Sequence, residues 1–315
     1  MRNKIVLKYI VMTIAGASLI AAPIAAQTTG AETKPVSVIV TVLGRGKEAA
    51  PAVTQDSVSV RQDGEARKVL GWQAVPDDGA GLDLVVYVDG ALRTAVAQQL
   101  QDVSAFVRTL PSKARTEVVY SYGGETQVVQ AMTTDHELAA KALRIPSGRS
   151  SASSGLYAGI EDFAKRWPEG GNRRVLLVIS NGIDLLRGAE DSYPGTNPDL
   201  QSAIEELHRK EISVYTIYAS SAGFAGQNEL LVSNGQGCLA QLASETGGQS
   251  YFEGLWTPIN FQPYLKAISK NLGHQYLLTF AGAADSSGKA HLSRLQVGVE
   301  VTPKADVLAP DHVFV

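Results

Sequence analysis

Leu82-Asp83-Leu84-Val85-Val86-Tyr87-Val88-Asp89 is the stretch that decides the fold class. Its apolar run has no polar alternation, which is typical of a strand buried on both faces of a parallel sheet. The run ends at Asp89, and an amphipathic pattern follows. Its apolar residues recur at spacings of three and four, as on one face of a helix: Leu92, Val96, Leu100, Val103, Phe106, Val107 and Leu110. The sequence therefore predicts a buried strand followed by a surface helix.

The same alternation continues to His274 and predicts the class α/β, with a doubly wound, mostly parallel sheet and helices on both faces. The expected strands are 116–122, 126–131, 174–179, 213–218 and 249–252. The expected helices are one from Asp135 and those at 154–167, 200–209, 238–245 and 259–272. The helix at Leu200 has the clearest start, because Asn197 can cap it and Pro198 suits its first turn.

Short strands flank this region at both ends of the chain. On the N-terminal side they are expected at 36–42, 58–61 and 68–72, and on the C-terminal side at 275–280, 295–301 and 312–315. The Asp63-Gly64 pair predicts a tight hairpin turn between the second and third strands. Because neither group is large enough to be stable alone, we expect both to pair into one small β unit.

Five segments follow from this pattern. The domain boundaries are a signal peptide at 1–26, a spacer at 27–34, an N-terminal β unit at 35–78, an α/β domain at 80–274 and C-terminal strands at 275–315. The first segment has early cations, a short apolar run and a small-residue end, which is typical of a secretory signal. It predicts an exported protein, periplasmic or secreted, and no later stretch is long and apolar enough to span a membrane.

The composition excludes several classes of protein. Lys and Arg total 28 against 31 Asp and Glu, a net charge of −3, which is not the basic footprint of a nucleic-acid-binding protein. Cys238 is the single cysteine, so no intrachain disulfide can form. Its apolar neighbours predict a buried side chain rather than a reactive thiol.

Long connections are expected at the carboxyl ends of the strands, where open α/β sheets bind ligands. They are 145–153, 181–198 and 220–236, whereas the connections at the other end are short. Such loops favour binding, although tolerated insertions would look the same. The third loop carries Phe224 and Leu230, which would form either an interaction patch or a short helix packed on the domain.

Several stretches, taken in order, resemble exported bacterial proteins with a von Willebrand factor type A-related domain. They are the β unit ending in 56–64, the strand ending in Asp89, the helix start at 154–160, the strand 175–180 with 181–184, and the segments 239–248 and 275–278. The resemblance covers nearly the whole chain after the signal peptide. It implies an adhesion-type domain with a divalent cation at the carboxyl end of the sheet.

The cation site implied by this resemblance is degenerate in this chain. The family's Asp-x-Ser-x-Ser motif corresponds to Asp89, Ala91 and Arg93, so both serine hydroxyls are missing. The family's Thr corresponds to Ser154, and its later Asp corresponds to the neutral Asn181. Because Mg²⁺ prefers charged oxygen ligands, we expect no cofactor, or Mg²⁺ bound only weakly. Arg93 is expected either to replace the cation by pairing with Asp89 or to point into solvent.

Two further residues near this face are auxiliary candidates, Asp184 and Phe224, although Asp184 also suits a turn or cap. No nucleophile elbow, phosphate loop or zinc-ligand spacing occurs in the sequence, so we expect no enzymatic activity. The leading function is a non-catalytic module that binds a protein through the carboxyl-end loops. A structural subunit of the cell envelope that assembles through its β unit is the alternative. A metal-dependent adhesin is a third.

Overall fold

The computed structural model describes residues 33–46, 48–76, 78–93, 96, 98–144, 155–167, 170–220, 225–254, 260–284 and 289–315. All of the described elements belong to one compact unit, Ala31–Val315. The predicted signal peptide and most of the predicted spacer lie outside the described residues.

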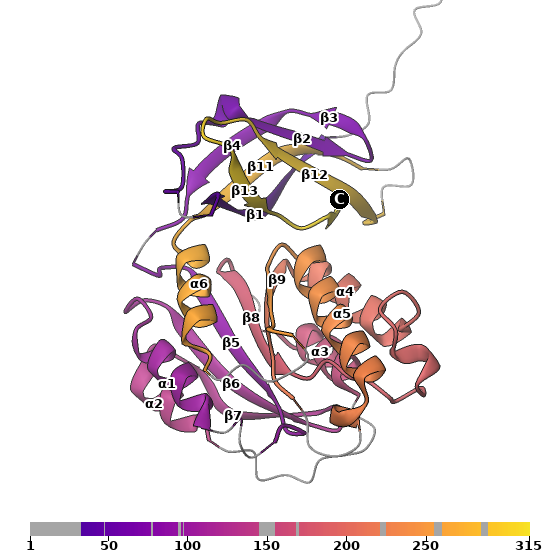
Figure 1. The fold of residues 1–315 in the computed structure, drawn as a ribbon. Coiled ribbons are helices and arrows are strands. Elements are labelled where there is room, and N and C mark those ends of the chain that lie inside the picture. The colour runs from indigo at the N-terminus through magenta and orange to yellow at the C-terminus, as the bar shows by residue number, and fades with distance from the viewer. Residues whose placement is uncertain are drawn as a thin grey trace, which may run out of the picture. The chain divides into compact units, whose positions relative to one another are not determined.

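A six-stranded sheet forms the α/β part of this compact unit (Figure 1). Its strand order is β10-β9-β8-β5-β6-β7. The strands are β5 (Leu82–Asp89), β6 (Arg115–Tyr122), β7 (Glu125–Thr133), β8 (Arg173–Ser180), β9 (Ile212–Tyr218) and β10 (Ser250–Tyr251). All neighbours are parallel except β7, which runs antiparallel to β6 at the edge. The predicted mostly parallel sheet is confirmed.

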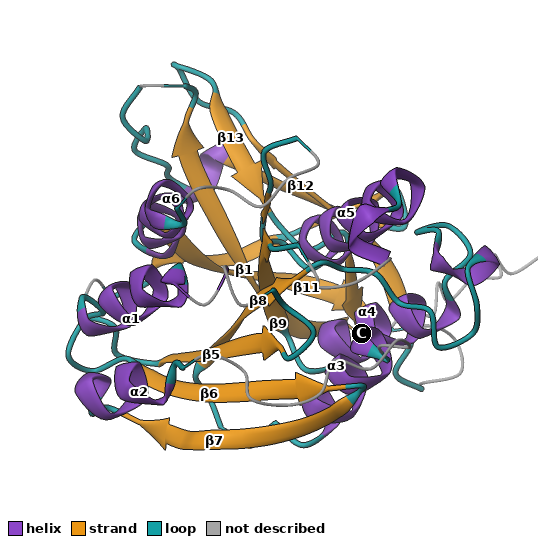
Figure 2. Cartoon of the chain, turned by 60° about the horizontal axis from the view of Figure 1, so that its bottom comes forward, coloured by secondary structure: helices purple, strands orange, loops and turns teal. Residues whose placement is uncertain are grey.

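Helices cover both faces of this sheet (Figure 2). One face packs against α1 (Leu100–Arg108), α2 (His136–Ala142) and α6 (Gln262–Leu272). The other packs against α3 (Leu156–Lys165), α4 (Pro198–Arg209) and α5 (Glu229–Glu245). All eight residues of β5 are buried, because alternate side chains enter the two cores. This arrangement confirms the doubly wound α/β class.

Helix boundaries agree with the sequence pattern in some places and not in others. The side chain of Asn197 caps α4 by accepting a hydrogen bond from the Leu200 amide at 2.9 Å, as predicted. Helix α1 begins at Leu100, although the apolar stripe starts at Leu92. Helix α5 begins at Glu229, nine residues before the expected start at Cys238. The second half of the predicted 220–236 loop, from Glu229 on, is therefore the first half of a helix.

Strands from both ends of the chain form two four-stranded sheets, with the orders β13-β1-β11-β4 and β14-β12-β2-β3. The strands are β1 (Thr33–Gly44), β2 (Val58–Gln62), β3 (Glu65–Arg67), β4 (Val69–Ala74), β11 (Gln275–Ala283), β12 (Leu292–Val299), β13 (Ala305–Leu308) and β14 (His312–Phe314). Their apolar side chains share a third core.

The predicted hairpin is present, but its second strand differs from the expected one. Asp63 and Gly64 have φ angles of 51° and 83°, as a tight hairpin turn requires. The hairpin partner of β2 is the short strand β3, not the expected strand 68–72. After Lys68 the chain crosses to the other sheet, where β4 pairs with β11.

Within the described ranges, no helix has the length and apolar character needed to cross a membrane.

Candidate functional site

The polar side chains predicted to form the site follow neighbouring strands. Asp89 ends β5, Ser180 ends β8, and Asn181 follows Ser180. Because β5 and β8 are parallel neighbours with Val88 opposite Ile179, their carboxyl ends bring these residues together. The sheet topology therefore places Asp89 and Asn181 at the same edge, as the sequence analysis required.

Asp89 is a buried carboxylate held by two protein donors. The Ser180 hydroxyl donates to Asp89 Oδ2 at 2.6 Å, and the Ala91 amide donates to Asp89 Oδ1 at 2.8 Å. Burial raises the pKa of Asp89, and these two hydrogen bonds only partly oppose the shift. Ser180 also accepts a hydrogen bond from the Gly182 amide at 3.0 Å, so one hydroxyl links both sides of the site.

Burial raises the pKa of Asp89 and the Ser180 and Ala91 hydrogen bonds oppose this rise, and Arg93 is not among the groups that set it. The charge of Arg93 instead acts on Tyr218 at the end of β9, where it opposes the upward shift that burial causes in the phenol's pKa. The Arg93 amide donates to the Ser220 carbonyl at 3.3 Å, which holds this segment beside β9.

The two other polar candidates bond to backbone amides of their own loop. Asn181 Oδ1 accepts a hydrogen bond from the Ile183 amide at 2.6 Å. Asp184 accepts from the Leu186 amide at 2.9 Å and from the Tyr157 amide at 3.3 Å. Burial raises the pKa of Asp184. Both side chains therefore shape the chain after β8, and Asp184 also ties it to the first turn of α3.

The remaining candidates divide between the described and undescribed parts of the chain. Ala91 offers only a methyl side chain, and its backbone amide makes the contact with Asp89. Ser154 and Phe224 lie outside the described residues. Sequence reasoning missed Ser180, the donor to Asp89. A hydroxyl residue at the carboxyl end of a buried strand, directly before Asn181, was the available signal.

The described oxygen donors do not fit a hard divalent cation. Mg²⁺ needs a near-octahedral set of oxygens at about 2.0–2.1 Å. Both carboxylate oxygens of Asp89 and the amide oxygen of Asn181 are directed at protein donors. The neutral Asn181 would add no negative charge to balance a bound dication.

Large apolar side chains are exposed on the connections around this site. Leu230, Tyr193 and Leu186 are 69, 57 and 50% exposed, the highest values for large apolar residues among the described ranges. Leu186 and Tyr193 lie between β8 and α4, and Leu230 lies in the first turn of α5. Phe252, directly after β10, is also exposed. All four belong to the carboxyl-end side of the sheet.

The loop between β8 and α4 is packed against helices α4 and α5. The Asn234 side chain on α5 donates to Ser192 Oγ at 3.1 Å, and the Cys238 thiol contacts the Ser192 carbonyl oxygen at 3.4 Å. The Arg187 guanidinium makes two hydrogen bonds of 2.8 Å to Asp199 at the start of α4. The loop between β8 and α4 is thus anchored at several points, and its exposed apolar side chains project from a fixed base.

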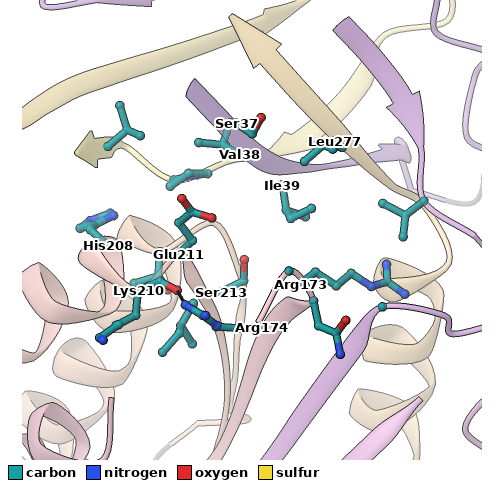
Figure 3. Close-up of a pocket in the computed structure, with 18 of the residues that line it drawn as sticks. Ser37, Val38, Ile39, Arg173, Arg174, His208, Lys210, Glu211, Ser213 and Leu277 are labelled. Carbon is teal, nitrogen blue, oxygen red and sulfur yellow. Dashed lines mark hydrogen bonds between the residues drawn. The ribbon is translucent and has the colours of Figure 1, made fainter. Parts of the chain in front are cut away.

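A pocket of about 660 Å³ lies away from this site, at the amino ends of the parallel strands (Figure 3). It is lined by residues of β1, by Arg173 and Arg174 of β8, and by the turn before β9. Arg173 donates to Gln275 Oε1 at 2.6 Å, and Arg174 donates to the Lys210 carbonyl at 2.7 Å. The pocket contains none of the sequence-predicted site residues.

No protein-family model matches the chain, and no curated protein matches it. Solved structures with some likeness include the conserved hypothetical protein BatB from Bacteroides thetaiotaomicron, with 16% identity, a TM-score of 0.45 and coverage of 61% of this chain and 97% of that chain. The vWF domain of the type V pili tip protein Mfa5 from Porphyromonas gingivalis has 12% identity, a TM-score of 0.43 and coverage of 62% and 97%.

The human COPII-coat protein Sec24c has 9% identity and a TM-score of 0.45, and the match covers 87% of this chain and 49% of that one. At these identities and TM-scores, the likenesses assign neither an activity nor a partner to this chain.

Proposed function

We propose that this chain is an exported, non-catalytic module that binds a partner protein through the carboxyl-end side of its α/β sheet. The observation that carries the proposal is the position of Leu186, Tyr193 and Leu230, the most exposed large apolar side chains in the described ranges. All three lie on the connections that follow β8 and β9. The exported location rests on the character of the N-terminal segment.

The chemistry of these connections suits a protein interface. Interface centres are enriched in aromatic and other large apolar side chains and in Arg, and their rims are polar. Tyr193 and Leu186 supply the apolar area, and Arg187 lies between them in the chain with its side chain half exposed. Because the loop is anchored to α4 and α5, little conformational entropy would be lost on binding.

The proposed contact is independent of a metal ion. Asp89 is satisfied by Ser180 and Ala91, and Asn181 by Ile183, so these oxygens have protein donors in place of a cation. In this proposal Asp89 and Ser180 hold the ends of β5 and β8 together, and the partner contacts the apolar side chains outside them.

Affinity capture from a cell-envelope extract tests this function. The bait is the wild-type protein or the triple variant Leu186→Ser, Tyr193→Ser, Leu230→Ser. The matched control carries Leu70→Ser, Val128→Ser and Leu138→Ser, three similarly exposed apolar residues elsewhere on the molecule. We expect a partner protein to be recovered with the wild type and the control, in EDTA as well as in Mg²⁺, and to be lost with the triple variant.

Two results would contradict the proposal. Equal recovery with wild type and triple variant would exclude the carboxyl-end connections as the binding surface. Recovery that disappears in EDTA and returns with Mg²⁺ would favour a metal-dependent adhesin.

A further inference from the structure

Three ionisable side chains from two distant parts of the sequence meet at the amino end of the sheet. His208 lies in the last turn of α4, Asp311 precedes β14, and His312 begins β14. One donor atom from each lies within 4.8 Å of the others, and within the described ranges this is the one such group of three metal-ligating residues. His208 borders the pocket of Figure 3. The cluster is therefore separate from the site around Asp89.

The distances between these donor atoms are close to those of a coordination shell. His208 Nε2 lies 3.5 Å from Asp311 Oδ1, and His312 Nδ1 lies 2.9 Å from the same oxygen. Ligand atoms about 2.0–2.1 Å from a tetrahedral Zn²⁺ are separated by ~3.3 Å. The first distance fits. The second is a hydrogen bond between His312 and Asp311, which a bound ion would have to replace, with the two atoms moving apart by a few tenths of an ångström.

His208 supplies the observation that points to a ligand. The residue is 6% exposed, yet its Nε2 atom has no hydrogen-bond partner among the described residues. Leaving a buried polar atom unsatisfied costs about 1–3 kcal/mol. This nitrogen faces Asp311 Oδ1 at 3.5 Å, which is too long for a good hydrogen bond, and that oxygen already accepts from His312. A bound ion would give the His208 nitrogen a partner.

The charges around the cluster also suit a cation. Glu245, at the end of α5, places a further acidic residue next to the cluster, because the Asp311 amide donates to the Glu245 carbonyl at 3.0 Å. The neighbouring Arg209 pairs with Glu205 and Glu206 and lies over the Phe314 ring at 4.2 Å. Its charge is therefore already compensated.

We propose that His208, Asp311 and His312 form a binding site for a divalent transition-metal ion, with Zn²⁺ as the ion that fits the ligand set. Two imidazoles and one carboxylate favour zinc and its neighbours over Mg²⁺ or Ca²⁺, which prefer all-oxygen sites. The bound ion joins the C-terminal strand β14 to the end of α4. It therefore acts as a structural link between the terminal strands and the α/β layers.

Zn²⁺ binding to the untagged, chelator-treated protein tests this proposal. We expect about one Zn²⁺ per chain by isothermal titration calorimetry and a higher Tm with Zn²⁺ than with Mg²⁺. His208→Ala and His312→Ala should each weaken Zn²⁺ binding at least about tenfold and remove most of the Tm increase. His274→Ala, on the turn after α6, is the matched control and should behave as wild type.

Circular dichroism without metal shows whether each variant is folded. His312 is the safer probe because its side chain is 34% exposed, whereas that of His208 is 2% exposed. The proposal is overturned if folded His312→Ala binds Zn²⁺ as tightly as wild type. It is also overturned if Zn²⁺ raises the Tm of the wild type no more than Mg²⁺ does.

Discussion

Asp89 is a carboxylate buried where its negative charge is poorly solvated. It is buried at the end of β5, and its hydrogen bonds with Ser180 and the Ala91 amide do not fully offset the loss of solvation, so its pKa is raised. A raised carboxyl pKa means that the folded protein binds this proton more tightly than the unfolded chain does. Stability from this group is therefore greatest at low pH, and falls as the pH rises from 3.8 through the folded-state pKa.

Asp89→Asn should accordingly stabilise the protein at neutral pH. The neutral amide keeps the shape of the side chain and removes the cost of the buried charge. We expect a higher urea midpoint than wild type at pH 7, and a difference that shrinks as the pH falls through the raised folded-state pKa toward 3.8, because Asp89 then becomes protonated in the folded protein. A variant less stable than wild type at pH 7 would show that the hydrogen bonds to the charged form outweigh the cost of burial.

Neither the backbone conformation of Gly182 nor the atoms packed around it leave room for a side chain. Its φ is +68°, and a Cβ atom would lie 2.2 Å from the Gly235 carbonyl oxygen and 2.6 Å from Leu239 Cγ. We expect Gly182→Ala to lower the free energy of unfolding by more than about 2 kcal/mol. Gly188→Ala is the control, because Gly188 has a φ of +107° but open space around its Cβ position. Equal losses in urea unfolding would mean that backbone strain alone sets the cost.

At the scale of elements, the side-chain cap of α4 contributes measurably to the stability of the protein. Asn197 accepts a hydrogen bond from the Leu200 amide at 2.9 Å, and the residue is buried. Asn197→Ala should lower the free energy of unfolding by about 1 kcal/mol, which is within the range known for helix caps. Asn228→Ala at the cap of α5 gives a comparison, since its side chain accepts from the Leu231 amide at 3.1 Å. An unchanged unfolding midpoint in the Asn197 variant would show that solvent replaces the cap at no cost.

The sequence predicted elements well where one local pattern decided them. The apolar run of β5 and the cap of α4 are examples, because burial on both faces and capping each leave a signature within a few residues. The start of α5 was missed because Gly235 and Gly237 read as loop residues. In the structure, a Cβ at Gly235 would meet the Asn181 carbonyl at 2.4 Å, and one at Gly237 would meet Pro194 at 2.8 Å. These glycines allow close packing, which depends on tertiary contacts.

The candidate site shows the same limit. The family resemblance placed Asp89 and Asn181 at one site, and the carboxyl ends of the parallel strands β5 and β8 bring them to one edge of the sheet. The donor to Asp89 was not predicted, because the contact from Ser180 depends on the register between β5 and β8. The short strand β3 was also missed, and the strand 68–72 was expected to pair in the hairpin instead. The difference reflects the crossing of the chain from one sheet to the other after Lys68.

At the scale of the whole molecule, the last strands complete two sheets. β13 pairs with β1 and β14 pairs with β12, and Val313 is buried in the core they share. A chain ending at Lys304 would lose both strands and expose two sheet edges. Measured in EDTA, so that the proposed zinc site plays no part, this variant should lose at least about 2 kcal/mol of stability. It should also form oligomers in light scattering, and a monomer of wild-type stability would contradict the prediction.

The pairing of β1 with β11 also constrains how the protein is made. Ser37 and Thr279, which share a hydrogen bond across these strands, are separated by 242 positions in the chain. During synthesis, β1 emerges long before its partner exists, and the same delay applies to any passage across a membrane that begins at the N-terminus. The strand Val36–Val42, rich in β-branched residues, must stay unpaired and unaggregated through that interval. Co-translational maturation is therefore the stage at which we expect this fold to depend most on chaperones.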